Sequence, residues 1–150
     1  MTDVRPMDAS IFRPEPMGVK DRLLNLDLRD RLAYDKERNT LFLNFEGVHV
    51  RRIEDIAAIR DAVIALCKQI GRRVAVVVNY DAFRLDPDLE VVYAEMVRAL
   101  EDQYYTRVSR YTTSAFMRVK LSQTLTRTVR PHIFETRAEA QAFHEAVGDR

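Results

Sequence analysis

Two apolar runs that end in the same way constrain the fold of this chain most strongly. Segments 41–46 (LFLNFE) and 74–81 (VAVVVNYD) both begin apolar and close on an asparagine, an aromatic residue and an acid. Continuous apolar runs predict strands that are covered on both faces, as in a mainly parallel sheet. The carboxyl ends of such strands share one edge, so similar polar groups are expected at one rim of an α/β domain.

The segment between the two runs predicts a helix. Apolar residues recur at three- and four-residue steps over residues 53–70, and Gly71 follows where a helix C-cap belongs. A strand, a helix and a second strand form a βαβ unit, and the two strands of such a unit are parallel.

The remaining pattern extends this order. Residues 33–35 and 40–45 predict a hairpin, with 48–50 as an extension of its second strand. Asp86 is the expected N-cap of a helix that ends near residue 104, and residues 107–113 and 132–135 predict further strands. Ser114 is expected to cap a third helix, and Thr136 and Glu139 form a capping box for the last one. The predicted fold class is α/β: a single-layer, mainly parallel sheet of four to six strands with packed helices.

Length and composition bound the domain organisation. The 150 residues, 47% hydrophobic and 31% charged, suit one domain with a real core. Pro6, Pro14, Pro16 and Gly18 predict a flexible arm over residues 1–18, ahead of a single domain at 19–150 that begins with a short helix at 19–25. A net charge of +1 argues against nucleic acid and membrane surfaces as partners. No segment is typical of a signal peptide or a membrane span, so we expect a cytoplasmic location.

Few residues carry a pattern that indicates chemistry. The three histidines, His49, His132 and His144, lack metal-ligand spacing and are expected at the surface or at strand edges. Cys67 lies among apolar residues, which favours a buried hydrophobe. The four glycines are isolated, which excludes a glycine-rich phosphate loop. We therefore predict no metal, no cofactor and no catalytic residue.

Two groups of residues are candidates for a binding site. Three hydroxyls precede the helix after residue 114, with two arginines upstream. They are either an ordinary helix cap or a site for an anion or a phosphorylated hydroxyl. The strand-end rim is the second group, in which Glu46 is either a reactive carboxylate or part of a turn. The candidate residues are Arg107, Arg110, Thr112, Thr113 and Ser114 in the first group, and Asn44, Glu46, Asn79 and Asp81 in the second.

Several stretches resemble a known family. Segments 23–26 (LLNL), 32–35 (LAYD), 39–47 (NTLFLNFEG), 76–81 (VVVNYD), 104–108 (YYTRV) and 110–116 (RYTTSAF) are similar to the C-terminal extension of bacterial acyl-CoA:acetate/3-ketoacid CoA-transferases. The likeness covers residues 18–147. The element order, with segment 131–140 (PHIFETRAEA), also resembles a STAS or SpoIIAA-like domain, a match to fold that is weaker evidence for function.

The resemblance implies association with CoA transfer between short acyl groups. It does not imply catalysis, because the catalytic core of that family is missing here and Glu46 does not match its glutamate motif. The chain begins with Met1, and it is compatible with a free-standing extension, a split gene product or a truncated chain.

Three functions follow, in this order of preference. The first is a non-catalytic accessory or interaction domain with a protein partner, such as a CoA-transferase core. The second is a STAS-like regulatory module that is switched by phosphorylation or anion binding at Thr112–Ser114. The third is a small-molecule binder or an enzyme that uses the strand-end rim. Residues 33–35 are expected to form an edge strand, which would allow pairing in a homodimer.

Overall fold

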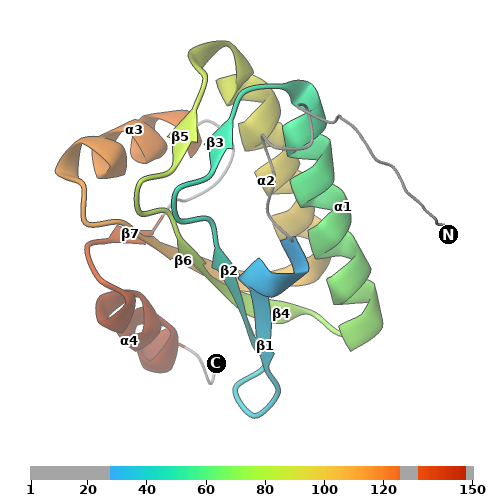
Figure 1. Cartoon of the computed structure of the whole chain (residues 1–150). Helices are drawn as coiled ribbons and strands as arrows, with labels where there is room; N and C mark the ends of the chain where they lie inside the picture. The colour runs from blue at the N-terminus through green and yellow to red at the C-terminus, as the bar shows by residue number, and fades with distance from the viewer. Residues whose placement is uncertain (1–27, 126–131, 148–150) are drawn as a thin grey trace, which may run out of the picture.

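The computed structural model describes residues 28–125 and 132–147, and the elements keep the labels of Figure 1. The predicted arm at 1–18 and the predicted helix at 19–25 lie outside these residues. The elements in chain order, with η for a 3₁₀ helix, are η2 (Leu28–Arg31), β1 (Leu32–Asp35), β2 (Thr40–Asn44), β3 (His49–Val50), α1 (Ile53–Ile70), β4 (Val74–Asn79), β5 (Arg84–Leu85), η3 (Pro87–Leu89), α2 (Glu90–Tyr104), β6 (Tyr105–Tyr111), α3 (Ala115–Leu125), β7 (Ile133–Phe134) and α4 (Arg137–Val147).

The main sheet has five strands in the order β1-β2-β4-β6-β7. The hairpin pair β1–β2 is antiparallel, and the other three pairings are parallel. The α/β class and the mainly parallel sheet are therefore confirmed. Strand β1 lies at one edge of the sheet, as predicted for residues 33–35.

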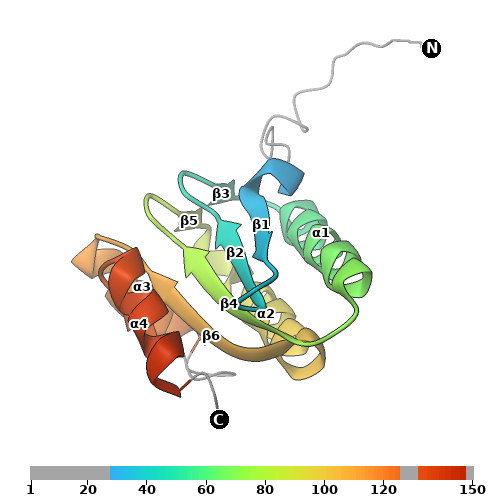
Figure 2. The ribbon, with the colours of Figure 1, turned by 90° about the horizontal axis from the view of Figure 1, so that it is seen from below.

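The helices cover both faces of this sheet. Figure 2 shows α1 and α2 on one side and α4 on the other, while α3 contacts α2 and β7. Alternate strand residues point to opposite faces. Leu41, Val76 and Val108 therefore face α1 and α2 in the larger core, whereas Val77 and Ser109 face α4. The Ser109 hydroxyl donates a hydrogen bond to the carbonyl of Ala140 in α4 (3.0 Å), which fixes the helix against the strands.

Most of the predicted helix boundaries agree with the structure. Gly71 ends α1 in the left-handed region (φ 84°), and its N–H donates to the Cys67 carbonyl. The Ser114 hydroxyl accepts from the Met117 N–H (3.0 Å) at the start of α3. Thr136 and Glu139 form the expected capping box at the start of α4.

One local prediction was wrong, and a second holds for the backbone but not for the side chain. Residues 48–50 do not extend β2, because Gly47 (φ 73°) turns the chain and β3 then pairs with β5 in a separate two-stranded sheet. Asp86 is the N-cap residue of η3, which leads directly into α2, but it makes no side-chain capping hydrogen bond, and its carboxylate binds His49 Nε2 instead (2.8 Å).

Candidate functional site

The polar residues at the ends of β2 and β4 meet at one rim, as the sequence predicts. The register pairs Asn44 with Asn79, and the Asn79 Nδ2 donates to Asn44 Oδ1 (3.2 Å). The same Nδ2 lies 3.5 Å from Glu46 Oε1. Arg31 donates to the carbonyls of Asn44 and Glu46 at 3.0 and 2.7 Å. These hydrogen bonds join the rim side chains to one another and to the backbone.

Asp81 continues this network to the third strand end. Its N–H donates to Asn79 Oδ1 (2.8 Å), and its own carboxylate accepts from the N–H and the hydroxyl of Thr113 at 2.6 and 3.1 Å. The Asp81 carboxylate therefore occupies the backbone donor that an external anion would use at Thr113. An anion at this point would have to displace it against like-charge repulsion.

The three hydroxyls before α3 have different environments. Thr112 is fully buried, and its hydroxyl accepts from the Ser114 N–H (3.3 Å). Thr113 is held by Asp81, and Ser114 is exposed while it caps the helix. An exposed hydroxyl can be modified without unpacking the domain. Thr113 and Ser114 are both exposed, but the Thr113 hydroxyl donates to Asp81, so Ser114 is the one that can be modified without breaking a contact to the rim.

The predicted arginines do not converge on these hydroxyls. Arg107 and Arg110 lie three residues apart on β6, so their side chains point to opposite faces of the sheet. Arg110 is only 1% exposed and pairs with Glu101 (2.9 Å) on the α1/α2 side. Arg107 lines a pocket on the α4 side. The proposed grouping of both arginines with Thr112–Ser114 is therefore wrong, because strand alternation separates them.

Tyr111 is a rim residue that the sequence reasoning did not include. Burial raises the pKa of its hydroxyl, Arg137 opposes this, and the carboxylates of Asp81 and Glu46 raise the pKa further. The Arg137 guanidinium lies 4.6 Å from the centre of the Phe42 ring on the same face. The rim thus holds acids and an arginine around a half-buried phenol that stays protonated at neutral pH.

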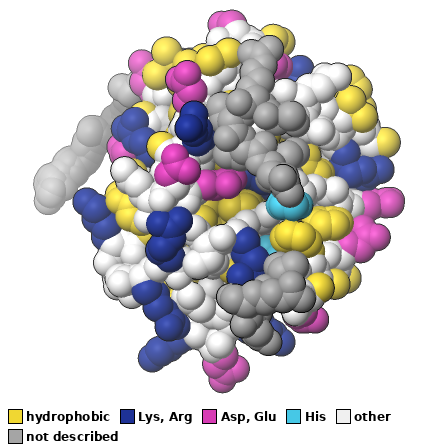
Figure 3. Space-filling model, turned by 180° about the vertical axis from the view of Figure 1, so that it is seen from behind, with side chains coloured by type: hydrophobic (Ala, Val, Ile, Leu, Met, Phe, Trp, Pro, Cys, Tyr) yellow, Lys and Arg dark blue, Asp and Glu magenta, His cyan; other side chains and the backbone are white. Residues whose placement is uncertain are grey.

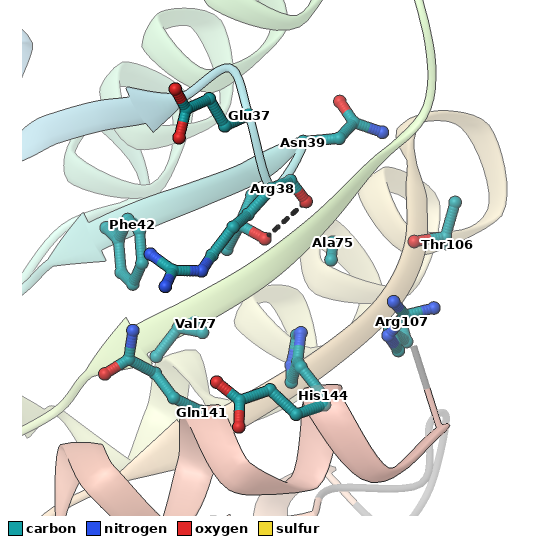
Figure 4. Close-up of a pocket in the computed structure, with 12 residues that line it drawn as sticks. Glu37, Arg38, Asn39, Phe42, Ala75, Val77, Thr106, Arg107, Gln141 and His144 are labelled. Atoms are coloured by element: carbon teal, nitrogen blue, oxygen red, sulfur yellow. Dashed lines mark hydrogen bonds between the residues drawn. The ribbon is translucent and has the colours of Figure 1, made fainter. Parts of the chain in front are cut away.

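A pocket of about 470 Å³ lies between the sheet and α4, toward the starts of β2 and β4 and away from the rim. In Figure 4, Gln141 and His144 project from α4 toward Val77 and Ala75 on β4, and Arg107 lies beside them. Phe42 closes the apolar side of the pocket, and the turn between β1 and β2 supplies its outer wall.

His144 is buried in this pocket and not at the surface or at a strand edge, so that prediction was wrong. The residue is 7% exposed, and neither ring nitrogen has a hydrogen-bond partner among the described residues. Burial lowers the pKa of His144 to about 4, and the positive charges of Arg107 and His132 contribute to this. The imidazole is therefore neutral at pH 7 and presents one donor and one acceptor.

The sequence contains one signal that could have located His144. It follows Ala140 by four residues and Phe143 by one, so it falls within the apolar stripe of the last helix. A histidine in such a stripe is expected to face the core.

The other side chains that could carry chemistry, a cysteine thiol and possible metal ligands, are poor candidates for a functional site. Cys67 is 2% exposed, and burial raises the pKa of its thiol to about 11, which leaves it protonated. In residues 28–125 and 132–147, no three His, Cys, Asp or Glu side chains are grouped so that they could hold a metal ion.

None of the helices in these ranges is long and apolar enough to cross a bilayer. Positive and negative side chains are interspersed on the face seen in Figure 3.

One apolar surface is left exposed on α3. Phe116 is 74% exposed, and Val119, one turn further along the helix, is 57% exposed. An ion pair between Lys120 and Glu90 (2.9 Å) joins α3 to the start of α2. We call Phe116 and Val119 the α3 apolar surface.

Comparison of the chain with protein-family models, curated proteins and solved structures finds no match.

Proposed function

We infer that this chain is a non-catalytic accessory domain that binds a protein partner through the α3 apolar surface. The observation that carries this proposal is the 74% exposure of Phe116, one helical turn from the exposed Val119. Burial of a phenylalanine side chain stabilises a complex by about 2 kcal/mol, so a partner that covers this surface gains affinity. Aromatic residues are also enriched among the side chains that dominate binding energy at protein interfaces.

The rim gives weaker support to a small-molecule or catalytic role. Asn44, Asn79, Asp81 and Thr113 bind one another through side-chain and backbone hydrogen bonds. A substrate would have to replace these contacts before it could bind, which lowers the net free energy of binding. This favours a structural role for the rim over the third predicted function.

The resemblance described above suggests the class of partner. We propose a CoA-transferase core that lacks a similar extension, in the cytoplasm. The test is an affinity pull-down from the cytoplasmic fraction of the source cells, read by mass spectrometry. We expect the wild-type chain to recover such a core and Phe116→Asp to lose it.

Ile53→Asp is the matched control, because Ile53 is also an exposed apolar residue (59%) but lies at the start of α1. Both variants should retain the wild-type unfolding midpoint. Equal recovery of the core by Phe116→Asp would refute the α3 apolar surface. Failure of the wild-type chain to recover any CoA-transferase core would refute the partner.

A regulatory switch at Ser114 is the second candidate, and it is favoured by one observation: the exposed Ser114 hydroxyl lies two residues before Phe116. A phosphate there would add negative charge at the start of α3, next to the proposed docking surface. Phosphate mapping of protein isolated from its own cells tests this candidate. A chain that is unmodified at Thr112, Thr113 and Ser114 under all growth conditions would contradict it.

A further inference from the structure

We propose that the pocket between α4 and the sheet binds a small apolar monocarboxylate, and that the imidazole N–H of His144 donates a hydrogen bond to its carboxylate. This site lies on the sheet face opposite α1 and α2 and is separate from the α3 apolar surface. It therefore stands independently of the protein-binding proposal.

The first argument is the state of His144. A buried polar group without a hydrogen-bond partner destabilises a folded protein, and such groups are rare. Neither ring nitrogen of His144 has a partner in the part of the chain that the structure describes, and the residue lines a pocket of about 470 Å³. That volume lies within the range of pockets that bind small molecules. A ligand that accepts a hydrogen bond from the imidazole N–H would remove this cost at the nitrogen that carries the proton.

The second argument is the charge around the ring. Arg107 lines the pocket, and its positive charge acts on His144, whose pKa it helps to lower. A guanidinium and a neutral imidazole N–H on the same cavity both favour a carboxylate oxygen. The ligand group that fits this end of the pocket is therefore an anion that accepts hydrogen bonds.

The rest of the lining combines an apolar strip on the sheet with polar and charged side chains around it. Phe42, Ala75 and Val77 offer apolar contact surface along β2 and β4. Glu37, Glu145 and Arg38 are the exposed charged residues of the lining, and because the two acids outnumber Arg38, a second negative charge on the ligand would meet net repulsion there. Phosphate esters and dicarboxylates fit this distribution less well than a monocarboxylate.

The test uses benzoate as the probe and the whole chain, with its histidine rings labelled with ¹⁵N. We expect saturable shifts of the His144 ring nitrogens and of the Ala75 and Val77 amides, with a dissociation constant of about 1 mM or weaker, as is usual for a small fragment. Benzyl alcohol has nearly the same shape but no charge. It should bind at least about tenfold more weakly, because a hydrogen bond to a charged group contributes that factor.

Two variants assign the effect to His144. His144→Phe removes both nitrogens and should weaken benzoate binding by about tenfold or more, while His144→Gln keeps a donor and an acceptor and should lose less. If His144→Phe does not fold, the ring-nitrogen shifts of the wild-type chain still decide the question.

Three results would overturn the proposal: no saturable shift at the His144 ring, equal affinity for benzoate and benzyl alcohol, or unchanged benzoate binding by a folded His144→Phe.

Discussion

The burial of His144 predicts a specific loss of stability in acid. The pKa of this ring is about 4 in the folded chain, compared with 6.5 for an ordinary histidine. Above pH 6.5 the ring is neutral in both states and has no effect on the pH dependence. Between pH 6.5 and 4 the unfolded chain binds a proton that the folded chain does not, so the free energy of unfolding falls as the pH falls.

The size of the effect follows from the gap of about 2.5 pH units. At about 1.4 kcal/mol per unit, the full loss is about 3 kcal/mol, and about 2 kcal/mol of it is reached by pH 5. Most of this cost comes from burial, and part of it comes from the like charges of Arg107 and His132.

The assay is urea unfolding of the wild type and of His144→Phe between pH 8 and pH 4.5. Protonation of carboxylates affects both proteins, so the difference between their curves isolates the histidine. We expect the variant to match or exceed the wild type at pH 8 and to gain about 2 kcal/mol on it by pH 5. Gln141→Leu, on the same helix and in the same pocket, removes no titratable group and should follow the wild-type pH dependence. Parallel curves for the wild type and His144→Phe would refute the reasoning.

Three further predictions concern residues whose environments the structure defines. Glu101→Ala should destabilise the chain by about 3 kcal/mol in urea unfolding, because it leaves the 1%-exposed Arg110 without its carboxylate partner; a loss below about 1 kcal/mol would contradict this. Cys67, 2% exposed and with its pKa raised to about 11, should react with a thiol reagent only after unfolding, and rapid labelling of the native chain would contradict its burial. Gly71→Ala should cost about 1 kcal/mol, because φ is 84° there and alanine is strained although space for its Cβ is available; an unchanged unfolding midpoint would contradict the left-handed cap.

The strong periodic signals explain why most of the fold was predictable. The apolar stripe of 53–70 strongly predicts a helix, and the apolar run of 74–79 strongly predicts a buried strand. Both elements occur in the structure with these bounds. The β3–β5 ladder was missed because two-residue strands carry no period. The N-cap position of Asp86 was predicted, but the sequence could not show that its carboxylate binds His49 at 2.8 Å instead of the helix.

The candidate site was less predictable, because proximity in the chain was taken for proximity in space. Arg107 and Arg110 stand near Thr112–Ser114 in the sequence, yet an odd spacing on a strand places the two arginines on opposite faces. This alternation could have been read from the sequence once the strand was assigned. The pocket could not be predicted from the sequence, because its shape depends on the position of α4 relative to β2 and β4.

The hydrogen-bonding state of the polar groups separates the two candidate sites. At the rim, each of Asn44, Asn79 and Asp81 has a partner within 3.2 Å, so folding itself accounts for these residues. At His144 the fold buries two ring nitrogens, and among residues 28–125 and 132–147 neither of them has a hydrogen-bond partner. Selection for stability alone would favour an apolar side chain at such a position. A histidine there is therefore better explained by a ligand than by packing, and His144→Phe tests this directly, because it should raise stability in acid and weaken benzoate binding in the same protein.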